Sequence, residues 1–197
     1  MSEGAIAAAT LNVIKIIDHV LSALERLTMV AACAALFAIM VLVFLDGTLR
    51  YTINRPLAFT VDVVNLYLIS AAFLPVLSHT LRHGGHICVD LFAKSLPKRL
   101  YNGLIGAALV LSAGLIAIMA YVVTDLSLES WNTGEYTVGL FAFPVWISKA
   151  IVAVSLLILL ARTVHLGLAN LIAGLTGFES FAFPILHSED DFEEEAV

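Results

Sequence analysis

Four long apolar runs divide this chain, and they constrain its fold more than any other feature. Residues 27–45 and 100–124 are uncharged stretches of 19 and 25 residues. A helix rises about 1.5 Å per residue, so each stretch is long enough to cross a hydrocarbon layer roughly 30 Å thick. Residues 63–81 and 144–161 are also apolar, and only Lys149 carries a charge there. Because a polar group near a helix end can reach the interface, both of these runs also predict spans.

The composition agrees with a membrane protein. Hydrophobic residues make up 60% of the 197 residues and charged residues 13%, whereas soluble domains average about 45–50% and about 25%. We therefore predict an all-α integral membrane protein with four transmembrane helices. The predicted parts are an N-terminal segment 1–26, a membrane domain 27–166 with spans at about 27–47, 61–82, 100–124 and 144–166, and a C-terminal segment 167–197 that ends in a disordered acidic tail.

The basic residues are unevenly divided between the two sides of this arrangement. The side that holds both termini and the middle loop carries seven lysines and arginines, against three on the other side. The positive-inside rule then predicts that both termini are cytoplasmic, in a multi-pass inner-membrane protein. The two groups are Lys15, Arg26, Arg82, Lys94, Lys98, Arg99 and Arg162, and Arg50, Arg55 and Lys149. Without the seven acids of the C-terminal segment, nine acids face ten basic residues, so no basic surface suggests nucleic acid.

Two segments outside the spans have amphipathic patterns. The sequence LNVIKIIDHVLSALER, residues 11–26, places its polar residues on one helical stripe and its apolar residues on the other. We predict an amphipathic helix over 1–26 that lies on the cytoplasmic face and turns into the first span. A second, short interfacial helix is predicted near residues 87–94, before Pro97. The polar stripe of the first segment comprises Asn12, Lys15, Asp18, His19, Ser22, Glu25 and Arg26.

The stretch RHGGHICVDLF, from Arg82 to Phe92, gathers histidines, a cysteine and an aspartate between the second and third spans. Such side chains could ligate a metal or a haem. Gly84 and Gly85 interrupt the helix, however, and no carboxylate or cysteine completes a recognisable ligand spacing. We therefore expect neither a metal nor a cofactor. A metal- or haem-binding membrane subunit of an oxidoreductase is the alternative, which absorption spectra and metal analysis would distinguish. The histidines concerned are His19, His79, His83, His86 and His165.

The chain lacks the residue patterns of an enzyme or of a complete carrier. It contains no GxSxG, no HExxH, no phosphate-binding glycine loop and no pair of carboxylates within one span, so we expect no catalysis. Carriers usually bring broken helices and polar groups together at the membrane midplane, and four plain spans do not supply this. Asp46 and Arg50, four residues apart, and Asp62 suggest local pairing at the outer interface or contact with another membrane protein.

Three segments resemble a known family. They are LRYTINRPLAF with the acid Asp62 shortly after it, RHGGHICVDLF followed by LPKR, and FAFPVWIS at the start of the fourth span. On these segments the chain resembles the small membrane subunit, DctQ-type, of tripartite ATP-independent periplasmic (TRAP) transporters. Phe59 and Asp62 stand where family members often have Trp and Glu. The residues that correspond by position are Arg50, Pro56 and Asp62 at the first outer connection, and Arg82, Gly85, His86, Val89, Asp90 and Pro97 in the inner loop.

The resemblance implies a non-catalytic permease subunit that serves as a scaffold. Its implied partners are a large permease subunit (DctM-type), a periplasmic substrate-binding protein and membrane lipids, in a system driven by a cation gradient that imports organic acids. The large subunit would hold the substrate and ion sites. Arg82 and Asp90 are then expected to fix the inner loop or dock it to the partner. A small subunit of a tripartite tricarboxylate system is a further alternative, which shares the four spans and lacks this loop.

Overall fold

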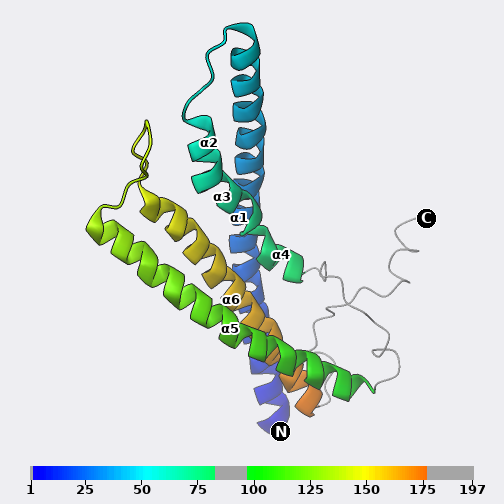
Figure 1. Cartoon of the computed structure of the whole chain (residues 1–197). Helices are drawn as coiled ribbons and strands as arrows, with labels where there is room; N and C mark the ends of the chain where they lie inside the picture. Colours follow the sequence, from blue (N-terminus) through cyan, green and yellow to red (C-terminus); the bar gives the residue numbers. More distant parts are fainter. Residues whose placement is uncertain (1, 83–96, 177–197) are drawn as a thin grey trace, which may run out of the picture.

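The computed structural model describes residues 2–82 and 97–176, and every element named within them is helical (Figure 1). Four helical stretches are long and apolar enough to cross a membrane. The prediction of an all-α membrane protein with four spans is thus confirmed. The elements are α1 (Ser2–Thr52), α2 (Thr60–Val63), the π-helix η1 (Val64–Leu68), α3 (Ile69–Phe73), α4 (Val76–Arg82), α5 (Lys98–Thr133) and α6 (Val145–Thr176). The interfacial helix predicted near 87–94 and the acidic tail lie outside the described residues.

The first span belongs to one continuous helix of 51 residues, α1. The sequence predicted a turn between an interfacial helix ending at residue 26 and the span that follows. That prediction was wrong, because residues 5–46 contain neither glycine nor proline and nothing interrupts the backbone hydrogen bonds. A helix of this length measures roughly 77 Å, more than twice the hydrocarbon thickness. It must therefore tilt strongly or extend beyond the bilayer.

The second span is less regular than the plain helix that the sequence suggested. It passes through α2, η1, α3 and α4 alongside α1 (Figure 1). Pro75 has no backbone N–H, and the chain makes a turn there between Phe73 and Val76. Upstream, the wide turn of η1 accommodates an extra residue in the helix. These two irregularities adapt the course of the second span to its neighbours.

Helices α5 and α6 form an antiparallel pair that crosses α1 at an angle (Figure 1). Their backbones approach closely where glycines meet. A Cβ atom built on Gly106 would lie 2.6 Å from the backbone nitrogen of Leu171, and one on Gly174 would lie 2.7 Å from the Cα of Gly103. At the other end the rings of Trp131 and Trp146 stack edge to face, 4.4 Å apart. Small residues at such contacts are the usual means by which membrane helices pack.

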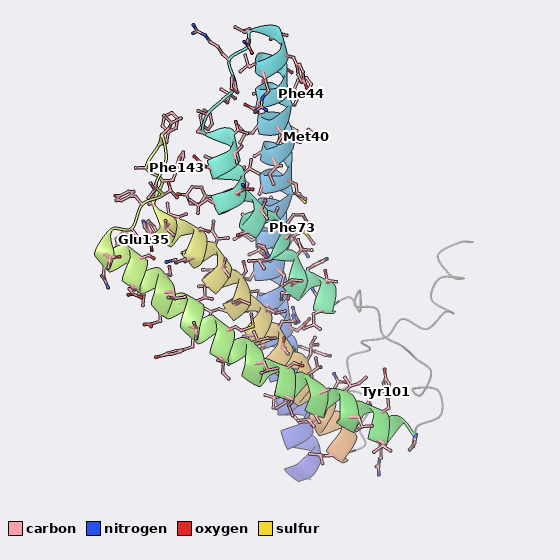
Figure 2. The ribbon with its side chains drawn as sticks, viewed as in Figure 1. Met40, Phe44, Phe73, Tyr101, Glu135 and Phe143 are labelled. Atoms are coloured by element: carbon pink, nitrogen blue, oxygen red, sulfur yellow. The ribbon has the colours of Figure 1, made fainter. Side chains whose placement is uncertain are left out.

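The surfaces that face away from the bundle are apolar. Met40 and Phe44 on α1 and Phe73 on α3 (Figure 2) are 59%, 70% and 62% exposed. In water, so many exposed large hydrophobic side chains would be unfavourable. They are the expected surface of a multi-pass protein whose solvent is lipid.

Glycine contacts on α5 give a testable prediction. Gly106→Ala places a methyl group against the backbone of α6, so we expect it to destabilise the protein by about 1–3 kcal/mol. Gly114→Ala is the matched control on the same helix, because a Cβ there meets nothing within 4 Å. Thermal unfolding of the purified protein in detergent measures both. Equal midpoints for the two variants would contradict close packing at Gly106.

Candidate functional site

A buried ionic network joins α1, α4 and α6. Arg162 on α6 and Glu25 on α1 both have side chains that are 0% exposed. The guanidinium donates from Nε to Glu25 Oε1 and from Nη2 to Oε2, each at 2.7 Å. This two-pronged geometry is the strongest form of arginine–carboxylate pairing. Ser78 on α4 donates its hydroxyl to Glu25 Oε1 at 2.6 Å, which brings the second span into the same network.

Asp18 and Arg82 extend the network toward the N-terminal end of α1 and the C-terminal end of α4. Asp18 Oδ1 accepts a hydrogen bond from Arg162 Nη1 at 2.6 Å, and its Oδ2 accepts one from Arg82 Nη2 at 3.4 Å. Ser22 lies between the acids and accepts a weaker bond from Arg162 Nη2. The two acids and two arginines carry no net formal charge together. Each of the four carboxylate oxygens accepts at least one hydrogen bond from a side chain of the same chain.

The packing of α5 against α6 indicates which part of α5 lies level with Arg162. Gly106 faces Leu171 and Gly167 faces Val110, so Arg162 stands opposite the middle of the uncharged run 100–124. An arginine in the hydrocarbon layer costs several kcal/mol unless a buried partner neutralises it. Glu25 and Asp18 provide that neutralisation. The pairing therefore requires the face of α1 that carries Asp18 and Glu25 to be turned toward α6.

Sequence patterns did not predict this network. Asp18 and Glu25 were placed on a stripe facing the cytoplasm, and Arg162 was counted only as an inner basic residue. The available signal was Arg162 itself, because it interrupts an apolar segment that continues to residue 176. A charge in that position predicts an acidic partner on a contacting helix. Asp18, Ser22 and Glu25 share one helical face. The local sequence pattern does not identify the helix that this face contacts.

The predicted pairing of Asp46 with Arg50 is confirmed. Arg50 Nη2 donates to Asp46 Oδ2 at 3.0 Å. The other carboxylate oxygen of Asp46 accepts the backbone N–H of Leu57 at 2.7 Å. Between Arg50 and Leu57, Asn54 has φ +56°, a left-handed conformation that asparagine tolerates better than most residues. Asp46 therefore fixes the path of the chain as it leaves α1 and returns toward α2.

The other candidate residues are only partly brought together. Pro56 is exposed in the connection before α2, and Asp62 lies in the first turn of α2, near Gly139 of the connection between α5 and α6. Arg82 contacts Asp18, and Pro97 precedes α5 as its N-cap. The remaining candidates, Gly85, His86, Val89 and Asp90, lie outside the described residues. Within residues 15–82 and 97–176, no group of three or more histidine, cysteine or acidic side chains could hold a metal ion.

Polar contacts also hold the connection between α5 and α6. Figure 2 labels Glu135 and Phe143 in this connection. Lys149 Nζ donates to Glu135 Oε2 at 2.8 Å, and Ser130 Oγ donates to the same oxygen at 2.5 Å. These two hydrogen bonds lower the pKa of the Glu135 carboxyl below its ordinary value. Tyr67 on η1 donates its hydroxyl to the carbonyl of Pro144 at 2.7 Å. The connection is thus held to α5, α6 and the second span.

Fold and site together define a multi-pass helical membrane protein whose described buried charges pair with one another. Residues 39–174 match the family model described as "Tripartite ATP-independent periplasmic transporters, DctQ component". This match covers more than half of the chain, which therefore belongs to the DctQ family and is a small membrane subunit of a TRAP transporter. The family is one of transporter components and not of enzymes. No curated protein and no solved structure matches the chain.

Removing one partner of the buried network should be more damaging than removing both. Arg162→Met leaves the buried carboxylate of Glu25 and the partly buried one of Asp18 without their main partner, and we expect a loss of about 3–5 kcal/mol in unfolding free energy. The double variant Glu25→Leu/Arg162→Met leaves Asp18 with Arg82 and should recover part of this loss. Unfolding of the purified protein measures both. The control Arg50→Met removes an exposed pair and should cost less than about 1 kcal/mol; additive losses in the double variant would contradict the coupling.

The contacts of Glu135 predict a pH dependence. Because the pKa of Glu135 is lowered in the folded state, its contribution to stability is present above the ordinary glutamate pKa near 4.5 and is lost as the pH falls below it. Glu135→Gln should therefore reduce the loss of thermal stability between neutral and acid pH. Glu129→Gln removes the same charge six residues earlier in the chain and should retain the wild-type pH dependence. Identical profiles for wild type and Glu135→Gln would contradict the prediction.

Proposed function

We propose that this chain is the scaffold subunit of a TRAP transporter that imports organic acids with the energy of a cation gradient. Its partners are a large permease subunit (DctM-type), which holds the substrate and ion sites, and a periplasmic binding protein that delivers the substrate. Membership of the DctQ family supports the kind of system and the kinds of partner. Substrate class, coupling to cations and the scaffold role are the parts that this proposal adds.

The observation that carries the scaffold role is the occupied ionic network. A substrate or ion site needs polar groups that are free to exchange partners. Here the carboxylates of Asp18 and Glu25 are both held by arginines of the same chain, and Glu25 also by Ser78. An arrangement of this kind resists repacking, because moving α1 against α6 would separate buried charges. It suits a static support beside a partner that moves.

The proposed location is the bacterial inner membrane with both termini cytoplasmic, as the distribution of lysines and arginines indicates. The connections 53–59 and 134–144 then face the periplasm, where a binding protein arrives. Both connections are held by side-chain hydrogen bonds, from Asp46 in the first and from Glu135, Lys149 and Tyr67 in the second. A fixed outer surface is what a docking partner requires.

Arg82 has a defined part in this proposal. It stands at the end of α4, where the stretch RHGGHICVDLF begins, and pairs with Asp18. Through Asp18 the start of the loop is connected to Arg162. We propose that Arg82, with Gly85, His86, Asp90 and Pro97, positions the inner loop for the large subunit, and that Arg50, Pro56 and Asp62 do the same at the outer face.

The proposal predicts that uptake requires this chain even when the large subunit is inserted. A tagged large subunit is expressed with and without the chain, its amount in the membrane is measured, and uptake of labelled organic acids is followed under imposed sodium or proton gradients. We expect uptake only with the chain present. Arg82→Ala should reduce co-purification with the large subunit several-fold, whereas the control Arg55→Ala, an exposed arginine outside the network, should not. Full uptake by the large subunit without the chain would overturn the scaffold role.

A further inference from the structure

The N-terminal half of α1 carries basic side chains on the face that points away from the other helices. The sequence indicated a single polar stripe on residues 11–26, and the structure divides that stripe in two. Asp18 and Glu25 turn inward to the arginines of the network. Lys15, His19 and Arg26 are exposed. Both acids of this segment thus pair within the bundle, and the exposed charges left among residues 15–26 are those of Lys15 and Arg26.

The three outward residues lie on one line along the helix. At about 100° per residue, positions 15, 19 and 26 fall within roughly 40° of one another. They extend over about 16 Å of helix length, at about 1.5 Å per residue. The stripe is therefore long and narrow, and it runs parallel to the helix axis.

The positive charge of this stripe is not neutralised by the rest of the described chain. The carboxylate oxygens of Asp18 accept hydrogen bonds from Arg162 and Arg82, and those of Glu25 accept from Arg162 and Ser78. Lys15 and Arg26 take part in none of the ion pairs among residues 15–82 and 97–176. An anion from outside the chain is thus the natural counter-charge.

An exposed apolar strip runs beside the basic stripe. Ile16, Val20 and Leu27 are 64%, 62% and 67% exposed, and at about 100° per residue they follow the basic residues around the helix by about a quarter of a turn. A helix with a basic edge and an adjoining apolar strip matches the boundary between lipid headgroups and acyl chains. An acidic protein partner in water would neutralise the stripe but would leave these apolar side chains uncovered.

We propose that Lys15, His19 and Arg26 form a binding surface for anionic phospholipid headgroups, with Ile16, Val20 and Leu27 among the acyl chains. The ammonium and guanidinium groups donate charge-assisted hydrogen bonds to headgroup phosphates, and His19 adds a further donor. The surface orders lipid along the first helix. It is independent of the transport role and of which side of the membrane holds the termini.

Lipid binding to the purified full chain tests the proposal. Native mass spectrometry in detergent follows the titration of phosphatidylglycerol and, separately, of phosphatidylcholine. We expect the wild type to bind phosphatidylglycerol more tightly. Lys15→Gln/Arg26→Gln should weaken that binding by roughly 25-fold, because each basic side chain near an anionic surface contributes about fivefold, and should leave phosphatidylcholine binding unchanged. Since both residues are exposed and outside the ionic network, thermal stability should stay at the wild-type value.

The matched control is Arg50→Gln/Arg55→Gln, which removes two exposed arginines, one in the last turn of α1 and one in the connection that follows it. It should retain most of the wild-type affinity for phosphatidylglycerol. Equal losses in the two double variants would mean that general positive charge, and not this stripe, attracts the lipid. Unchanged phosphatidylglycerol binding by Lys15→Gln/Arg26→Gln would also overturn the proposal. A role in assembly with the large subunit is tested by other variants, so either idea can fail alone.

Discussion

The buried charge of Arg162 is the constraint on which the arrangement of the spans depends. A guanidinium among apolar helices is tolerated only beside acids that neutralise it. Arg162 donates two short hydrogen bonds to Glu25 and a third to Asp18, and Ser78 donates another to Glu25. One arginine on α6 thus determines which face of α1 turns inward and brings α4 to the same point.

The two kinds of helix contact in this protein work differently. Helices α5 and α6 approach through glycines, Gly106 and Gly174 among them, and their packing depends on shape. The contact of α1 with α6 includes an ion-pair network, which specifies partners more narrowly than apolar surfaces do. Polar groups in membranes usually mark function. In this subunit the described buried charges join α1, α4 and α6, which supports the proposed scaffold role.

Local sequence was sufficient for much of the fold. Uncharged runs such as 100–124 predicted the spans, because transfer into hydrocarbon depends on the composition of each segment. The contact of Asp46 with Arg50 followed from a spacing of four residues on one helix. The loop signature around Arg82 and the other family motifs led to the DctQ family, which the match over residues 39–174 confirms. Each of these features depends on residues that are near one another in the chain.

What only the tertiary structure decided concerns residues that are far apart. Glu25 and Arg162 are 137 positions apart, and their pairing depends on how α1 crosses α6. The sequence by itself determined that residues 11–26 carry a polar stripe, because helical periodicity is local. It could not divide that stripe into Asp18 and Glu25 facing inward and Lys15 and Arg26 facing outward. That division follows from the energy of burying charge, which is settled only when a second helix supplies the opposite sign.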